Sequence, residues 1–144
     1  MSKFTLLTVT LLLCFKAATA AAQTTLMKPG LWEIILTNQV ANKDSRQIFT
    51  SRSCYSAADI ASAQRSLPMQ GEMGMKCTLK DYKLVGADAK WQVSCVGKAS
   101  TLSGMTSVKF AAEKYQGQAL LNSKAGGKAI KITQKIQATR ISNC

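Results

Sequence analysis

Alternation of apolar and polar residues is the feature that most limits what this chain can fold into. Near the end of the sequence, one side of an extended segment carries Ile130, Ile132, Ile136 and Ala138, and the other side carries Lys131, Thr133, Lys135 and Gln137. Successive side chains of a β-strand point to opposite faces, so this pattern predicts a strand with one buried and one solvated face. The segment 31–40 alternates in the same way and predicts a second such strand.

Five further segments have the β-branched and aromatic content of strands: residues 47–53, 78–85, 90–96, 106–111 and 115–121. Polar or glycine-containing turns separate the strands, among them Ser123 to Lys128 (SKAGGK). One helix is predicted from the capping box that starts at Ser56 (SAAD) to about Ser66, because Pro68 prevents its continuation. We therefore expect a mainly β fold, a curved antiparallel meander or partial barrel of about seven strands, with the helix as a plug or cover.

The first residues predict export. A basic start is followed by an apolar run at 5–15 that is too short to cross a bilayer as a helix, and then by small residues. We interpret residues 1–22 as a signal peptide, cleaved after Ala20 or Ala22, and residues 23–144 as a single β-rich domain. A lysine between the run and the cleavage site leaves an uncleaved anchor as the alternative. No later segment is apolar enough to span a membrane, so we expect a periplasmic or secreted protein.

Four cysteines remain in the expected mature chain: Cys54, Cys77, Cys95 and Cys144. An even number in an exported chain predicts two disulfides, because oxidising compartments favour them. Four cysteines allow three pairings, and we prefer Cys54 with Cys77 and Cys95 with Cys144. Cys14 lies in the apolar run, where we interpret it as a hydrophobic residue and not as a lipid-anchor cysteine, because a leucine precedes it.

The charge balance is strongly basic, with 19 Lys and Arg residues against 7 Asp and Glu residues and a net charge of +12. From Lys98 onward, a long series of lysines is opposed only by Glu113. A basic surface attracts anions, so the expected partner is an anionic lipid, a glycan or another protein of the cell envelope. Nucleic acid is not expected, because no basic helix with interleaved aromatic residues is present. The alternative is that the charge only keeps the surface solvated.

The absence of histidine excludes the catalytic arrangements that depend on this residue and most zinc sites. Ser-His-Asp triads, Cys-His pairs and most zinc sites require that residue. A Ser-Lys dyad or a carboxylate pair stays open, but the 7 acidic residues form no paired motif. SKAGGK lacks the glycine spacing and the final Ser or Thr of a phosphate loop, so we interpret it as a hairpin turn. We expect no enzymatic activity and no cofactor.

The methionine-rich stretch Met69 to Cys77 (MQGEMGMKC) is the one candidate metal site. Met69, Met73, Met75 and Cys77 carry the soft sulfur ligands that select Cu(I). Methionine is also a common filler of irregular apolar contacts, and a disulfide at Cys77 would consume that ligand. We prefer an ordinary loop and keep periplasmic Cu(I) binding as an alternative function.

Several motifs carry a resemblance to a bacterial family. Pro29 to Glu33 (PGLWE) opens the first predicted strand, and CYSAAD, WQVSC, YQG and the final RISNC follow over nearly the whole chain. The sequence resembles the domain of unknown function 3617, a group of small exported proteins. The resemblance implies an envelope protein with paired cysteines and no established activity, and it offers no catalytic residues. PGLWE has a sufficient structural interpretation, because proline and glycine shape the start of the strand and Trp32 buries a large ring.

The function expected from these features is a non-enzymatic binding or structural module for an anionic or amphipathic envelope component. The concave face of the sheet would form the pocket, with Lys109, Lys131 and Lys135 available for an anion. A further alternative is a secreted inhibitor of another enzyme.

Overall fold

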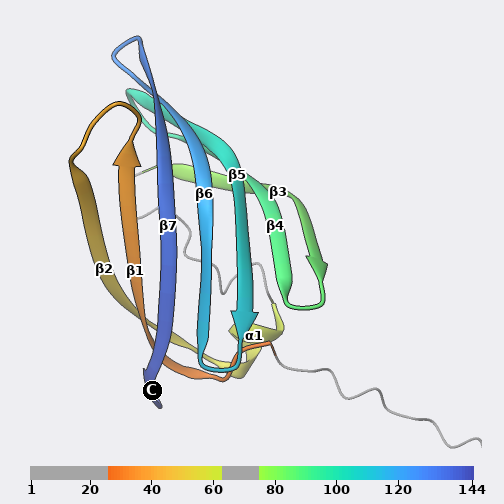
Figure 1. The fold of residues 1–144 in the computed structure, drawn as a ribbon. Coiled ribbons are helices and arrows are strands. Elements are labelled where there is room, and N and C mark those ends of the chain that lie inside the picture. Colours follow the sequence, from red (N-terminus) through yellow and green to blue (C-terminus); the bar gives the residue numbers. More distant parts are fainter. Residues whose placement is uncertain (1–25, 63–74) are drawn as a thin grey trace, which may run out of the picture.

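In a computed structural model, the described residues, 26–62 and 75–144, form one seven-stranded sheet and one short helix (Figure 1). The elements are β1 (Gly30–Val40), β2 (Arg46–Tyr55), α1 (Ala57–Ala61), β3 (Lys76–Val85), β4 (Asp88–Val96), β5 (Ser100–Ala111), β6 (Lys114–Ala125) and β7 (Lys128–Ser142). Every pair of neighbouring strands is antiparallel. The mainly β fold predicted from the alternation of residues is confirmed.

The strand order is β2-β1-β7-β6-β5-β4-β3. Each strand pairs with the next one in the sequence, except that β2 and β3 form the two edges of the sheet, and β1 pairs with β7. This is the order of an up-and-down barrel that is open between β2 and β3. The expected meander with partial barrel character is therefore confirmed, and the sheet is open.

The strands after Gly97 are longer than predicted. β5 begins at Ser100 and not at Thr106, and β6 continues to Ala125, inside the segment interpreted as a turn. Only Gly126 and Gly127 separate β6 from β7, and both have the positive φ angles (55° and 76°) that glycine adopts without strain. The ladder between β5 and β6 is continuous from end to end, so pairing extends both strands through residues with weak strand propensity.

The helix begins where the capping box predicts. The Ser56 hydroxyl oxygen accepts from the backbone N–H of Asp59 at 3.1 Å, and the Asp59 carboxylate accepts from the Ser56 backbone N–H at 2.8 Å. α1 runs from Ala57 to Ala61, and its Ile60 packs against the core. The helix is shorter than predicted, because it ends at Ala61 with Ser62 as its C-cap. The rest of the predicted helix, residues 63–66, lies outside the described residues.

Two glycines let the central strands approach closely as the sheet curls. Gly104 on β5 and Gly117 on β6 alternate with buried residues and face the core. A Cβ at Gly104 would lie 2.0 Å from the carbonyl oxygen of Leu120, and one at Gly117 would lie 2.1 Å from that of Ser107. Strands can bend this tightly only where no side chain stands between them. Figure 1 shows both edges of the sheet bending back toward the side on which α1 lies.

The concave side of the curved sheet holds the core. Its largest fully buried side chains include Trp32, Tyr115 and Ile34, each exposed by 2% or less. A buried polar residue, Gln134, shares this face and donates from Nε2 to Oδ1 of Asn38 at 2.8 Å, which satisfies a group that would otherwise destabilise the core. The convex side is polar. On β7, the four residues predicted to face water are all exposed: Lys131, Thr133, Lys135 and Gln137.

The disulfides join Cys54 to Cys144 and Cys77 to Cys95, so our preferred pairing was wrong. Cys77 and Cys95 are direct partners in the hairpin of β3 and β4. The other bridge spans the start of β1, because Leu31 pairs with Cys54 on one side and with Ser142 on the other. Its Cα atoms are 5.8 Å apart, which is normal for a disulfide. The pairing follows from strand order, which spacing in the sequence does not reveal.

Candidate functional site

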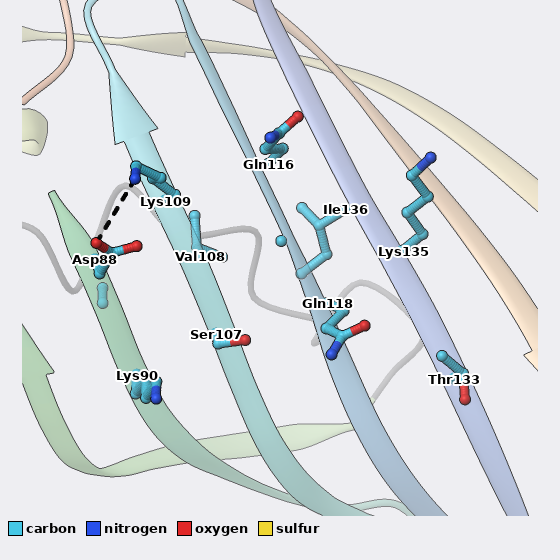
Figure 2. A pocket seen from close by; sticks show the side chains of 12 residues that line it. Asp88, Lys90, Ser107, Val108, Lys109, Gln116, Gln118, Thr133, Lys135 and Ile136 are labelled. Atoms are coloured by element: carbon cyan, nitrogen blue, oxygen red, sulfur yellow. Dashed lines mark ion pairs between the residues drawn. The ribbon is translucent and has the colours of Figure 1, made fainter.

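A shallow hollow of about 750 Å³ crosses four strands on the convex face (Figure 2). Its floor is a row of residues that are direct partners across the sheet: Ala89 on β4, Val108 on β5, Gly117 on β6 and Ile136 on β7. By alternation these residues face the concave side, so the convex surface is low along this row. The rows on either side of the floor point outward and form the walls.

One wall of the hollow has a lysine at each end. Lys90, Ser107, Gln118 and Lys135 are successive partners across β4, β5, β6 and β7. Three strand spacings separate the Cα atoms of the two lysines, or about 14 Å. A hydroxyl and an amide therefore lie between two flexible ammonium groups, and each of these side chains can donate a hydrogen bond. Figure 2 shows the four side chains as sticks along this row.

The opposite wall has its charge partly neutralised. Asp88, Lys109 and Gln116 are partners across β4, β5 and β6. The Lys109 Nζ lies 4.0 Å from the Asp88 Oδ2, and both side chains are more than half exposed, so the pair is weak. Among the ion pairs of the part of the chain that the structure describes, none involves Lys90 or Lys135. The first wall is therefore the side of the hollow with uncompensated positive charge.

The lysines predicted for anion binding are only partly brought together. Lys109 and Lys135 both line the hollow, but Lys131 lies farther along β7, opposite Asn122. The expected concave location was wrong, because the alternation that buries the apolar residues of each strand turns these lysines to the convex side. Lys90 was missed. The alternation around Trp91 already turned Lys90 outward, but its partnership with Ser107 depends on a register that the sequence does not reveal.

A sequence model described as "protein of unknown function (DUF3617)" matches residues 27–144. The chain belongs to the DUF3617 family. The resemblance noted in the sequence is thus confirmed, and it extends from just before PGLWE to the last residue. No curated protein and no solved structure matches this DUF3617 chain.

Two of the DUF3617-like motifs meet at one corner of the fold. Arg140, from the last strand, donates from Nε to the carbonyl oxygen of Pro29 at 2.7 Å and from Nη2 to Oδ1 of Asn143. Gly30 lies under this side chain with φ of 144°, and a Cβ there would be 2.4 Å from the Ser142 carbonyl oxygen and 2.6 Å from the Arg140 Nε. PGLWE and RISNC therefore pack against each other, and their contacts hold the first strand against the last.

Trp32 of the PGLWE stretch is structural, as predicted. Its ring is fully buried, and its Nε1 donates to the carbonyl oxygen of Lys28 at 3.1 Å. The ring stacks on Tyr115 with centroids 5.6 Å apart and meets Tyr55 at 6.3 Å. Burial, and secondarily the neighbouring Tyr55, raises the pKa of the Tyr115 phenol, so that group stays neutral.

The methionine stretch gives the DUF3617 protein at most a reduced set of metal ligands. Met69 and Met73 lie outside the described residues. Met75 is partly buried against the core near Gly97, and the sulfur of Cys77 is bonded to Cys95. A disulfide sulfur is not a thiolate ligand. Residues 26–62 and 75–144 contain no group of three or more His, Cys, Asp and Glu side chains that could hold a metal ion.

The predicted signal peptide, 1–22, and its two cleavage sites lie outside the described residues, so export stays a prediction. The two disulfides are compatible with an oxidising compartment. Within the described ranges, the structure contains no helix with the length and apolar character needed to cross a bilayer.

Proposed function

We propose that this DUF3617 protein is a non-enzymatic binding module of the cell envelope, which holds an anionic component in the hollow on its convex face. The observation that carries the proposal is the wall formed by Lys90, Ser107, Gln118 and Lys135. Two lysines without an acidic partner among the described residues flank groups that can donate hydrogen bonds. A phosphate, sulfate or carboxylate in the hollow would supply the missing negative charge and accept from the groups between.

The chemistry of the wall favours recognition of charge over recognition of rings. Every aromatic side chain in the described ranges belongs to the concave face: Trp32, Phe49, Tyr55, Tyr82, Trp91, Phe110 and Tyr115. Proteins that bind nucleic acid strands stack the bases on exposed aromatic residues, and the convex face offers none of these. A headgroup or an acidic glycan needs only cations and hydrogen-bond donors.

The envelope location predicted from the sequence supports this choice of ligand. The apolar run at 5–15 and the small residues after it predict export, and the paired cysteines suit an oxidising compartment. Phosphate-bearing lipids and acidic glycans are the abundant anions there. The sequence has no histidine, which favours binding over catalysis.

Dextran sulfate, a soluble polyanion without acyl chains, tests the proposal. We expect Lys90→Glu/Lys135→Glu to bind it at least tenfold more weakly than the wild type, because each lysine at an anionic surface contributes about 1 kcal/mol. The matched control is Lys43→Glu/Lys128→Glu, which changes the net charge equally but lies in two hairpins outside the hollow. The control should lose about threefold at most, through the overall field alone.

Equal losses in the two charge-reversed proteins would refute the hollow as the site, since the general basicity of the chain would then explain all of the binding. Titration at several salt concentrations strengthens the comparison, because the field of the whole protein is screened by salt more completely than a local contact.

A further inference from the structure

Three adjacent rows across the convex face carry cations and no carboxylate. The row that forms the wall begins at Lys83, the partner of Lys90, and continues through Lys135 to the uncharged Thr37 and Ile48 at the β2 edge. The next row starts at Lys80 on β3 and ends at Arg46 on β2, and all the residues between them are uncharged. The third row contains Lys131.

The acids of the convex face lie outside these rows. Asp88 is close to Lys109, and Glu33 accepts from Arg52 with Nη2 and Oε2 3.1 Å apart. Asp81 lies in the bulge that interrupts the pairing of β3 with β4, between Lys80 and Lys83 at the edge of the sheet, so it reduces the net charge only where these two rows begin. The three rows together carry six cations and form a basic surface, with Lys90, Lys131 and Lys135 on inner strands and the others on the two edge strands. The two ion pairs lie beyond the rows on the side of the hollow.

An apolar pair lies at the centre of this basic surface. Met105 on β5 and Leu120 on β6 are direct partners, and they are 46% and 56% exposed. Leu120 belongs to the central strand of the seven. The next outward-facing residues along these strands are Ser107 and Gln118 of the hollow on one side, and Ser103 and Asn122 on the other. Two exposed apolar side chains are thus surrounded first by uncharged polar groups and then by lysines.

We propose that this face docks on an anionic lipid surface, with Met105 and Leu120 entering the boundary between headgroups and acyl chains and with the surrounding lysines binding lipid phosphates. The inference rests on the proposed function and identifies the bound anions as the phosphates of a lipid surface. A convex face touches a plane at its crown, and the crown of this sheet is the central strand that carries Leu120 (Figure 1).

Charge and composition favour a lipid surface over the other occupants of such a face. A second copy of this chain would place like charges together. A soluble anion bound in the hollow would not contact Met105 and Leu120, and these two side chains would stay exposed to water. Peripheral membrane proteins combine apolar contacts at the acyl boundary with basic residues around them, and that combination is present here.

The decisive comparison uses the full chain with vesicles of phosphatidylglycerol and phosphatidylcholine in equal parts. We expect Met105→Ser/Leu120→Ser to bind these vesicles about tenfold more weakly than the wild type, because two apolar side chains lose their burial. The control Val85→Ser/Val96→Ser removes two exposed apolar residues, 77% and 59% exposed, outside the three rows and should bind as the wild type does. Vesicles of phosphatidylcholine alone should bind none of these proteins.

A second readout reports insertion directly. Tryptophan introduced as Leu120→Trp should shift its emission to the blue on phosphatidylglycerol vesicles and should be quenched by lipids brominated on their acyl chains. The native Trp32 and Trp91 are buried on the concave side and give a constant background. This measurement also decides the matter if the serine variant does not fold.

The two proposals fail in different ways. Vesicle binding that is unaffected by Met105→Ser/Leu120→Ser, or a Leu120→Trp signal without quenching, overturns docking on lipid. In that case dextran sulfate binding that still depends on Lys90 and Lys135 leaves the hollow as the site of a soluble anion or glycan. Loss of that dependence overturns the proposed function itself. The serine variant should bind dextran sulfate as the wild type does, because that probe has no acyl chains.

Discussion

At the scale of single residues, the start of β1 shows how a short motif can be conformationally demanding without being a ligand site. Gly30 adopts a φ of 144° beneath the guanidinium of Arg140, and the carbonyl oxygen of Ser142 lies 2.4 Å from the position that a Cβ would take. A residue with a Cβ would have to move the end of β7 as well as adopt a strained backbone. The PGLWE motif is therefore explained by the packing of the first strand against the last.

Gly30→Ala should destabilise the protein by about 2–4 kcal/mol, because the added methyl group meets backbone at 2.4 Å. Gly86→Ala is the control, since Gly86 also has a positive φ (60°) but no atom within 4 Å of the Cβ position. It should cost about 1 kcal/mol, for the backbone alone. Urea unfolding of both variants measures the difference. Equal losses would mean that the contact with β7 contributes nothing.

At the scale of strands, curvature decides which faces become core and which become surface. β5 and β6 approach closely at Gly104 and Gly117, and this approach lets one sheet enclose a core, beside which residues 26–62 and 75–144 place one short helix. The same curvature leaves the lysine-bearing face convex. A flat sheet of this sequence would expose both faces of every strand to a similar extent.

Gly117→Ala should cost about 2–4 kcal/mol, because its Cβ would lie 2.1 Å from the Ser107 carbonyl oxygen and the two strands would have to separate. Gly97→Ala is the matched control. Its nearest neighbours, at 3.3 Å, are the flexible side-chain atoms Met75 Cγ and Ser100 Oγ, so it should cost less than about 1 kcal/mol. Unfolding midpoints in urea test this. A Gly117→Ala protein as stable as Gly97→Ala would show that the sheet does not need a glycine there.

The strands were predictable from the sequence because the residues within each strand have the alternation or the composition typical of β-structure. The alternation from Ile130 to Ala138 and the capping box at Ser56 are local signals, and both describe the structure correctly except at Ile130, which was expected on the buried face and is 41% exposed. The register between strands is not local. Nothing near Lys90 indicates that Ser107 will stand opposite it, so the wall of the hollow could not be assembled from the sequence. The lysines were wrongly predicted to lie on the concave face for a related reason. The core of a curved sheet occupies its concave side, so the polar side of each strand, which carries the lysines, is convex.

At the scale of the whole molecule, the two disulfides act on different distances along the chain. The bridge between Cys54 and Cys144 joins residues 90 apart and holds β2 and the C-terminus across β1. The bridge between Cys77 and Cys95 joins residues 18 apart within one hairpin. A longer loop loses more conformational freedom in the unfolded chain when it is closed.

Cys54→Ala/Cys144→Ala should therefore destabilise the protein by about 4–5 kcal/mol, and Cys77→Ala/Cys95→Ala by about 3 kcal/mol. Urea unfolding of the two double variants compares these losses. Peptide mapping without reduction checks the pairing itself, and a peptide that links Cys54 to Cys77 would contradict the fold described above.

The central claim is tested most directly by acetylating the lysines of the wild-type protein with and without bound dextran sulfate. Mass spectrometry then measures how strongly the polyanion protects each lysine. The account predicts that Lys90 and Lys135 become protected while Lys43 and Lys128, in the hairpins, react as they do in the free protein. Uniform protection of all four lysines, or protection that is greatest at Lys43 and Lys128, would contradict the hollow on the convex face as the anion site.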